Sequence, residues 1–318
     1  MELHPFSTQL RQRLAGAGLE PADVFDLVAR TLQEDLGGGN DVTSRASIPP
    51  LQRSVATFAS RGRGRLAGID LARAVFEVTC GADALRFEVM INDGHAVAAR
   101  DVIARVESST RALLAAERSA LNLLCHLSGI ASATALWVEA VAGTGAAIRD
   151  TRKTTPGLRA LEKYAVRCGG GVNHRMSLSD AALIKDNHIA AAGGVAATFA
   201  LVREHAGDLP IEIEVDTLDQ LREAIDAGAD LVLLDNMDLD TLRAAVDVAR
   251  RHEATSGRPV VLEASGGLSL ENARAVAETG VHFISVGALT HSSKILDIGL
   301  DVEETREGTR GARADRES

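Results

Sequence analysis

The chain has 318 residues, 46% of them hydrophobic and 25% charged, so it can bury a full-sized core and is not expected to be disordered throughout. Its net charge of −10 and its few aromatic residues (Phe 7, Trp 1, Tyr 1) argue against nucleic acid, which needs a basic face or a stacking platform. The three cysteines form no CxxC pair and the N-terminus carries no secretion signal, so we predict reduced thiols and a cytoplasmic protein.

Residues 1–115 predict a small α+β domain. A helix is expected over 22–36, because three glycines follow it at 37–39 and glycine commonly ends a helix. Strand-like segments follow at 55–58 and 102–106, with no regular helix expected between them. The motif RGRGR at 61–65 fits a solvated turn between two strands better than a nucleic-acid site.

The stretch 130–148 is apolar enough to raise the question of a membrane. It contains Thr134, Glu139 and two glycines, which a membrane span of this length rarely tolerates together. We predict the end of a helix running into a strand, and no membrane partner.

Short apolar runs with β-branched residues then recur, with helical patterns between them. Thr217 and Gln220 form a capping box before one such helix, and Gly228 stands where that helix ends. Strand and helix alternating in this way predict parallel βα units, closed into a barrel or laid out as a doubly wound sheet. The runs span 146–149, 181–184, 211–215, 231–234, 260–262 and 283–286.

Polar residues or glycines follow these runs. Glu214, Asp235-Asn236, Glu263-Ala264-Ser265-Gly266-Gly267 and Gly287 all stand at or just after the carboxyl end of a predicted strand. In a barrel the loops after the strands share one mouth, where active sites lie. The pattern therefore favours a barrel over an open sheet. The charged tail after about residue 301 has no apolar period, and its last dozen residues are expected to be disordered.

A basic stretch lies between Asp150 and His188, at the predicted barrel mouth. It has eight basic residues against four acids in a protein that is acidic overall. Arginine binds carboxylate and phosphate with two donors, and lysine adds a mobile charge, so the stretch predicts a ligand with several anionic groups. Salt bridges to surrounding acids are the alternative. The basic residues are Arg152, Lys153, Arg159, Lys163, Arg167, His174, Arg175 and Lys185.

The acids and glycines at the other strand ends suggest complementary roles. Glu214 and Asp235 follow neighbouring strands, and paired carboxylates near phosphates hold Mg²⁺ through water or accept hydrogen bonds from ribose. Gly266, Gly267 and Gly287 come late in the series, where barrels often bind phosphate through backbone N–H groups.

Other motifs point less clearly to function. The glycines at 169–171 lack the ending of a P-loop and predict a flexible loop or a close backbone approach. No His, Cys and Asp spacing indicates a structural zinc site. His126 is expected to be a bonded core or interface histidine. Arg118 either pairs with Glu117 or reaches into a pocket.

Several of these segments together resemble the quinolinate phosphoribosyltransferase family. The resemblance extends over roughly residues 20 to 300 and is strongest in the long central motif. The segments are EDLGGGNDVTS (34–44), ERSALNLLCHLSGIA (117–131), DTRKTTPGLR (150–159), EKYAVRCGGGVNHR (162–175), LIKDNHI (183–189), IEVD (213–216), LLDN (233–236), LEASGG (262–267) and ISVGALTHS (284–292).

The resemblance implies a fold and an assembly. We expect an α/β protein in which an N-terminal α/β sandwich precedes an open, seven-stranded, TIM-like α/β barrel. The expected division is 1–128 for the sandwich, 129–290 for the barrel, 291–305 for a segment returning to the sandwich and 306–318 for a disordered tail. Homodimers or larger assemblies, hexamers included, are implied, with each active site completed by the neighbouring subunit.

The resemblance also implies an activity: phosphoribosyl transfer from phosphoribosyl pyrophosphate to quinolinate with loss of CO₂, in NAD biosynthesis. Arg152, His174, Arg175 and Lys185 would surround quinolinate, together with Arg118 from the partner subunit. Lys153 would lie between the two substrates, next to Thr151. Glu214 and Asp235 would serve the ribose and Mg²⁺, and with Lys153 and Lys185 make up the catalytic set. The 5′-phosphate would be held by Ser265, Gly266, Gly267, Val286, Gly287 and Ala288.

Three other functions stay open from the residues alone. A related phosphoribosyltransferase could act on another anionic heterocycle, nicotinate included. A Schiff-base aldolase could use a strand-end lysine such as Lys185. A non-catalytic module could sense phosphoribosyl pyrophosphate, although no matched site residue is missing.

Overall fold

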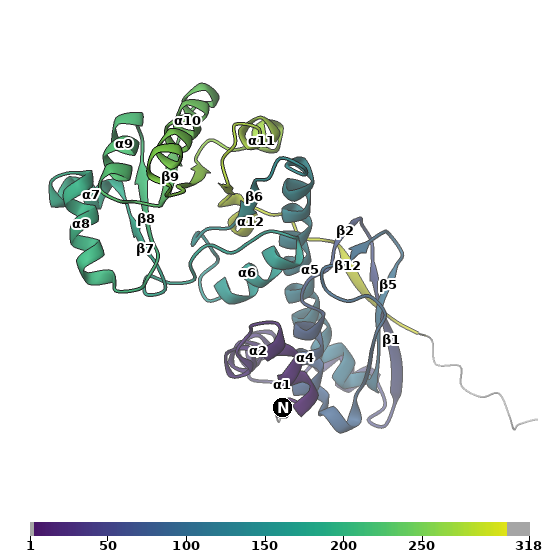
Figure 1. Cartoon of the computed structure of the whole chain (residues 1–318). Helices are drawn as coiled ribbons and strands as arrows, with labels where there is room; N and C mark the ends of the chain where they lie inside the picture. The colour runs from purple at the N-terminus through teal and green to yellow at the C-terminus, as the bar shows by residue number, and fades with distance from the viewer. Residues whose placement is uncertain (1–2, 304–318) are drawn as a thin grey trace, which may run out of the picture.

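The structure is a computed structural model that describes residues 3–303. Its two lobes are connected by the long helix α5 (Thr110–Ala140), which runs from the N-terminal lobe into the barrel lobe (Figure 1). One apolar window of α5 is long enough to cross a membrane, but 61% of that window is buried inside the protein. The helix is therefore the shared core helix of the two lobes. It ends at Ala140 and strand β6 begins at Ala147, which confirms the predicted helix-to-strand passage.

The N-terminal lobe packs helices against a four-stranded antiparallel sheet with the order β12-β1-β5-β3. Helix α2 buries a stripe of Val24, Val28 and Leu32 at a spacing of four residues, and it ends at Gly37, whose φ of 57° suits glycine. The elements are α1 (Thr8–Gly16), α2 (Pro21–Leu36), α3 (Val42–Ser47), β1 (Arg53–Ser60), β2 (Gly64–Arg65), α4 (Ile69–Cys80), η1 (Ala82–Ala84), β3 (Arg86–Val89), β4 (Ala96–Val97), β5 (Val102–Ser109) and, from the end of the chain, β12 (Ile298–Val302).

One prediction for this lobe is wrong. Helix α4 lies between the two strands that were expected to follow one another without a regular helix. Nearly every side chain of α4 is buried, Ile69, Val75, Phe76 and Val78 among them. A helix buried on all sides shows no apolar stripe, and its β-branched residues suggest a strand instead.

The barrel lobe is built from parallel strands in the order β6-β11-β10-β9-β8-β7, with helices outside them (Figure 1). The strands are β6 (Ala147–Arg149), β7 (Ala182–Ile184), β8 (Ile211–Val215), β9 (Leu231–Asp235), β10 (Val261–Ser265) and β11 (Phe283–Ser285). The helices are α6 (Arg159–Cys168), α7 (Asp186–Ala192), α8 (Val195–Ala206), α9 (Leu218–Asp226), α10 (Leu239–Ser256), α11 (Leu270–Ala277) and α12 (Ala288–His291).

The barrel is open between β6 and β7, and a seventh strand is not formed there in the described residues. A single parallel bridge joins Arg149 of β6 to Val172. The ladder stops at this bridge because the next donor is used elsewhere: the N–H of His174 bonds to Oδ1 of Asp150 at 2.8 Å. Within residues 3–303 the barrel therefore has six strands and one isolated bridge, where seven strands were predicted.

The glycines at 169–171 bring this segment against α5. A Cβ on Gly169 would lie 2.5 Å from Cβ of Thr134, and one on Gly171 would lie 2.9 Å from Cγ2 of the same threonine. Of the two predictions for this motif, the close backbone approach is the one confirmed.

After β11 the chain returns to the N-terminal lobe, where β12 pairs antiparallel with β1 (Figure 1). The division of the chain at residues 128, 290 and 305 stays a prediction. The segment 306–318, expected to be disordered, lies outside the described residues.

Candidate active site

A cavity of about 450 Å³ lies at the carboxyl ends of the barrel strands. Both predicted groups of side chains meet there, the cations that follow β6 and β7 and the acids at the ends of β8 and β9. The lining residues are Thr151, Arg152, Lys153, His174, Arg175, Leu183, Lys185, Glu214, Leu233, Asp235, Glu263, Ser265 and Ser285.

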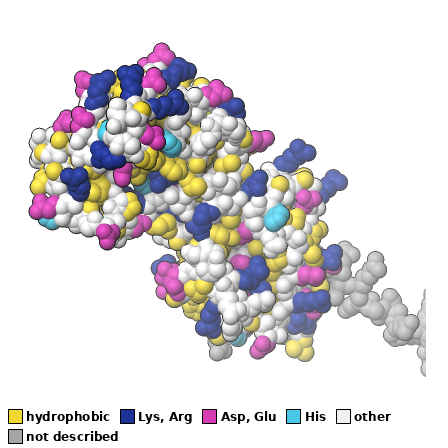
Figure 2. Space-filling model, viewed as in Figure 1, with side chains coloured by type: hydrophobic (Ala, Val, Ile, Leu, Met, Phe, Trp, Pro, Cys, Tyr) yellow, Lys and Arg dark blue, Asp and Glu magenta, His cyan; other side chains and the backbone are white. Residues whose placement is uncertain are grey.

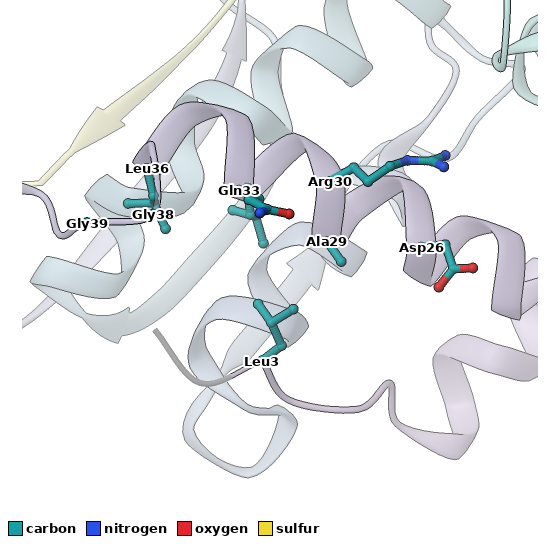
Figure 3. A pocket seen from close by; sticks show the side chains of 9 residues that line it. Leu3, Asp26, Ala29, Arg30, Gln33, Leu36, Gly38 and Gly39 are labelled. Carbon is teal, nitrogen blue, oxygen red and sulfur yellow. The ribbon is translucent and has the colours of Figure 1, made fainter.

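A second cavity, of about 510 Å³, lies along α2 beside the segment that carries Leu3 (Figure 3). Its wall is formed by apolar side chains and glycines, with Asp26, Arg30 and Gln33 as its polar groups. Among residues 3–303, no set of titratable groups converges there as it does at the barrel mouth. The barrel-mouth cavity is therefore the candidate active site.

Two arginines give the cavity its anion-binding character. The Nε atoms of Arg152 and Arg175 are buried and have no hydrogen-bond partner among the described residues. Burial lowers the pKa of Arg175 below its ordinary value, and the neighbouring charge of Arg152 lowers it further. Two guanidinium groups that repel one another and keep free donors are suited to binding an anion.

The basic stretch is less uniform than its sequence indicated. Lys163 is fully buried and pairs with Asp150, and its Nζ also donates to the carbonyl of His174 at 2.9 Å. Arg159 bonds to Thr154 and to the carbonyl of Met176. Outside the cavity, on the face shown in Figure 2, basic and acidic side chains are interspersed over the barrel lobe. The cations available to a ligand are therefore those lining the cavity.

The acids lie on the opposite side of the mouth. Nζ of Lys185 is 2.7 Å from Oε2 of Glu214, which connects the two sides. Burial raises the pKa of Asp235, and the carboxylates of Glu214 and Asp216 raise it further. Glu214 and Asp235 crowd one another although Lys185 pairs with Glu214, so the two carboxylates suit a divalent cation.

The glycine loops lie beside the cavity rather than on its lining, to which they contribute only Ser265. A Cβ on Gly287 would lie 3.1 Å from Cδ of Lys153, so this glycine lets the lysine pass. Gly266 and Gly267 have positive φ angles of 82° and 60°, which glycine adopts freely. Val286 and Ala288 flank Gly287 at the β11–α12 junction.

Arg118 does not reach this cavity. Arg118 is exposed on α5, at the edge of the N-terminal lobe. The neighbouring charged residues there include Glu117 and Asp301. His126, two turns further along α5, is bonded as expected: its Nε2 is 2.9 Å from Oε1 of Glu162.

Several residues that hold the site in place were not identified from the sequence. Asp150 accepts hydrogen bonds from Lys163, Asn173 and the N–H of His174, and so fixes the segment after α6. Glu162 accepts from the N–H of Thr155 at 3.0 Å and holds the loop that carries Lys153. Their position at the start of two motifs, DTRKTTPGLR (150–159) and EKYAVRCGGGVNHR (162–175), was the only sequence signal.

Asn236 ends the motif LLDN (233–236), and the sequence alone indicates no function for it. It is not glycine, yet its φ is 53°, and its Nδ2 donates to Oδ2 of Asp235 at 2.6 Å. Its Oδ1 lies so close to Gly266 that a Cβ there would be 2.1 Å away. Asn236 thus orients a carboxylate of the cavity at the expense of backbone strain.

A buried group of three residues has the spacing of metal ligands: His174, Glu212 and Glu263, with ligand atoms within 4.8 Å of one another. They are far apart in sequence, so spacing could not reveal them. Arg149 contacts Glu263 directly and lies 3.9 Å from Glu212, so a guanidinium already supplies the positive charge at this point.

The comparisons with known proteins point to one enzyme family. The model of the quinolinate phosphoribosyl transferase C-terminal domain matches residues 130–301, and that of the N-terminal domain matches residues 41–128. The chain is 49% identical over 277 residues to the nicotinate-nucleotide pyrophosphorylase (carboxylating) of Mycobacterium leprae, covering 87% of this chain and 96% of that one. It is 43% identical over 275 residues to the probable enzyme of the same name from Bacillus subtilis, covering 86% and 91%.

Solved structures agree with the sequence relatives. The nicotinate-nucleotide pyrophosphorylase of Francisella tularensis superimposes with a TM-score of 0.83 at 38% identity, covering 89% of this chain and 96% of that chain.

Proposed function

The chain belongs to the quinolinate phosphoribosyltransferase family, and from this premise we propose that the barrel-mouth cavity is its active site. The enzyme transfers the phosphoribosyl group of phosphoribosyl pyrophosphate to quinolinate, giving nicotinate mononucleotide, pyrophosphate and CO₂. The observation that carries the assignment of the cavity is the pair of half-buried arginines, Arg152 and Arg175, whose buried Nε donors have no partner in residues 3–303.

Quinolinate carries two adjacent carboxylates, and the cation side of the cavity matches a dianion. Three cations line this side: Arg152 follows β6, Arg175 precedes β7 and Lys185 follows β7. We assign these three to quinolinate, with His174 beside them. Guanidinium groups bind carboxylates with paired donors and so fix the ring as well as its charge.

Phosphoribosyl pyrophosphate then takes the side of the acids and glycines. Lys153 lies between the cation side and the side of the acids and glycines. Its side chain passes Gly287, and its carbonyl accepts a hydrogen bond from Oγ1 of Thr290 at 2.8 Å. Thr151 supports this loop, because its Oγ1 accepts from the N–H of Lys153 at 3.0 Å. We assign the 5′-phosphate to the loops of Ser265–Gly267 and Val286–Ala288, and the ribose hydroxyls to Glu214 and Asp235.

Mg²⁺ fits the pair Glu214 and Asp235, because burial and the neighbouring carboxylates raise the pKa of Asp235 even though Lys185 pairs with Glu214. When bound, the ion supplies positive charge to the pyrophosphate oxygens as they depart. We propose these two acids as its protein ligands, directly or through water.

The side chains divide the reaction between them. Arg152 and Arg175 hold the pyridine nitrogen in line with C1 of the ribose, where a C–N bond forms as the C–O bond to pyrophosphate breaks. Lys153 stabilises the charge that builds on the leaving oxygens. The alkylated ring nitrogen is then cationic, so the ring can keep the electron pair released when the 2-carboxylate leaves as CO₂, and a proton replaces it. Lys185 and Lys153 both line the cavity and are its candidate proton donors.

The ion pair of Lys185 with Glu214 also argues against an aldolase. A Schiff-base lysine must be neutral, whereas Nζ of Lys185 lies 2.7 Å from a carboxylate.

We propose that two subunits share each site. Arg118 is exposed on α5 and outside its own chain's cavity, so it is available to a partner's cavity. Mixing inactive Arg118→Ala protein with inactive Lys153→Ala protein should restore activity, because a mixed dimer contains one intact site. The shared site is ruled out if proven subunit exchange restores no activity.

The three free cysteines support a reducing, cytoplasmic location.

The assignment of the cavity is tested by Arg175→Ala. We expect the KM for quinolinate to rise at least about tenfold and the KM for phosphoribosyl pyrophosphate to change little, because only the dianion loses a charge-assisted contact. Nicotinate mononucleotide formation, followed by chromatography, gives both constants. An equal rise in both would contradict the assignment.

A further inference from the structure

Beneath the mouth of the barrel lies a second layer of side chains that carries charge. Side chains two residues apart in a strand face the same side, so Glu212 lies below Glu214, and Glu263 lies below Ser265. Both inner glutamates are buried, 2% and 0% exposed, although this layer of a barrel is usually filled by Val, Ile and Leu. Arg149 of β6 completes the layer, which we call the charged layer: Arg149, Glu212 and Glu263.

Glu263 is fully satisfied within this layer. One of its oxygens contacts Nη1 of Arg149, and the other accepts from Oγ of Ser285. Burial raises the pKa of Glu263, and the charge of Glu212 raises it further.

Glu212 is not satisfied in the same way. Neither of its oxygens makes a well-aligned hydrogen bond within residues 3–303, and Arg149 is 3.9 Å away. Its nearest polar neighbour is Nε2 of His174, at 2.8 Å. A buried carboxylate with one donor in reach is stable only if that donor carries a hydrogen.

The other ring nitrogen of His174 decides where that hydrogen is. Nδ1 accepts a hydrogen bond from the backbone N–H of Arg175 at 2.6 Å, so Nδ1 holds no hydrogen. The ring hydrogen is therefore on Nε2, the atom that faces Glu212. In this arrangement Nδ1 of His174 is hydrogen-bonded, whereas Nε2 lies 2.8 Å from Glu212 without being aligned for a hydrogen bond in the structure. The main chain of His174 is held through Asp150 and Lys163.

We propose that Glu212 is a positioning residue for the quinolinate site: it holds His174 in the Nε2–H form, so that Nδ1 can bind the N–H of Arg175 and fix that arginine in the cavity. The proposal rests on the function proposed above and deepens it. It makes His174 the link between the charged layer and Arg175, and leaves Arg152, Arg175 and Lys185 of this subunit as the cations that meet the dianion.

Two variants of nearly equal volume separate this role from a simple charge effect. Glu212→Gln and Glu212→Leu remove the same negative charge, but only glutamine keeps an oxygen that can accept from Nε2–H. We expect Glu212→Gln to keep the quinolinate KM within about threefold of wild type and Glu212→Leu to raise it about tenfold, the effect of one lost buried hydrogen bond. The KM for phosphoribosyl pyrophosphate should stay within about threefold in both.

Each outcome bears on the idea. Equal changes in the quinolinate KM of Glu212→Gln and Glu212→Leu would show a pure charge effect and overturn the proposal. A lower quinolinate KM in both variants would also overturn it, because that is the result expected if Glu212 acts only by repelling the dianion. If wild-type enzyme forms no product from quinolinate, the proposed function fails instead. Thermal melts of both variants check that each is folded.

A spectroscopic measurement on the wild-type enzyme keeps the proposal testable if Glu212→Leu does not fold. Nitrogen-15 NMR of labelled histidine, with His174→Asn used to assign the signal, reports which ring nitrogen bears hydrogen. The expected pattern at neutral pH is protonated Nε2 and bare Nδ1. A signal with hydrogen on Nδ1 would overturn the proposal.

Discussion

Replacing Asn236 by glycine should separate stability from activity. Asn236 has φ of 53° at the end of β9, a conformation that glycine adopts without strain. Its side-chain amide donates to Oδ2 of Asp235 at 2.6 Å, so Asn236→Gly relieves the backbone and removes the donor together.

The two effects differ in size. A non-glycine residue in the left-handed region costs about 1 kcal/mol, and glycine costs about 0.5–1 kcal/mol through the entropy of the unfolded chain, so the free energy of unfolding should change by less than about 1 kcal/mol. A hydrogen bond to a carboxylate is worth about 1.5 kcal/mol, which is about tenfold in an equilibrium. We therefore expect kcat/KM for phosphoribosyl pyrophosphate to fall about tenfold.

The assay is steady-state kinetics with each substrate varied in turn, together with urea unfolding. Arg100→Gly is the matched control, because Arg100 is the other non-glycine residue with positive φ in the described chain, at 77°, and it lies in the N-terminal lobe. It should change stability equally little and leave both KM values alone. Unchanged activity in Asn236→Gly would refute the positioning of Asp235 by its neighbour.

Two further substitutions test the contacts that hold the lobes and the site together. Tyr164→Phe removes the hydroxyl that donates to Oδ2 of Asp93 at 2.6 Å, and should cost about 1.5–3 kcal/mol at neutral pH. Burial raises the pKa of Asp93, whereas the hydrogen bond from Tyr164 lowers it, so Tyr164→Phe should raise this pKa further. The variant's loss of stability should therefore be greatest above the folded-state pKa of Asp93. It should shrink in acid, where Asp93 is protonated in both the folded and the unfolded state. A loss that does not vary with pH in urea titrations would contradict this. Lys163→Met leaves Asp150 buried without its cation, so unfolding should become easier by about 3–5 kcal/mol. A loss below about 1 kcal/mol would mean that the pair adds little.

Much of the barrel could be predicted because its strands are short apolar runs ended by polar residues. The strand expected at 211–215 is β8 without any shift, and the capping box of Thr217 and Gln220 forms as expected at the start of α9. The polar residues that end the strands do line one cavity, since parallel strands present their carboxyl ends together.

The parts that could not be predicted depend on burial on all sides. Helix α4 shows no apolar stripe, so the pattern that identifies a helix is missing. Lys163 belongs to a basic stretch in the sequence, and only the fold reveals that it is buried against Asp150. Glu212 did carry a signal, because an acid inside a strand that should be apolar on both faces is unusual. Glu263 was expected to follow the strand at 260–262 and to face the barrel mouth, but β10 extends to Ser265 and places it inside the barrel.

The central claim is tested most directly by following the carbon that the reaction releases. Purified enzyme with phosphoribosyl pyrophosphate, Mg²⁺ and quinolinate labelled in its 2-carboxylate should release one labelled CO₂ for each pyrophosphate. With nicotinate in place of quinolinate, no pyrophosphate should form, because we propose that Arg152 and Arg175 together bind two carboxylates. Pyrophosphate released without CO₂, or turnover of nicotinate at the quinolinate rate, would contradict the account.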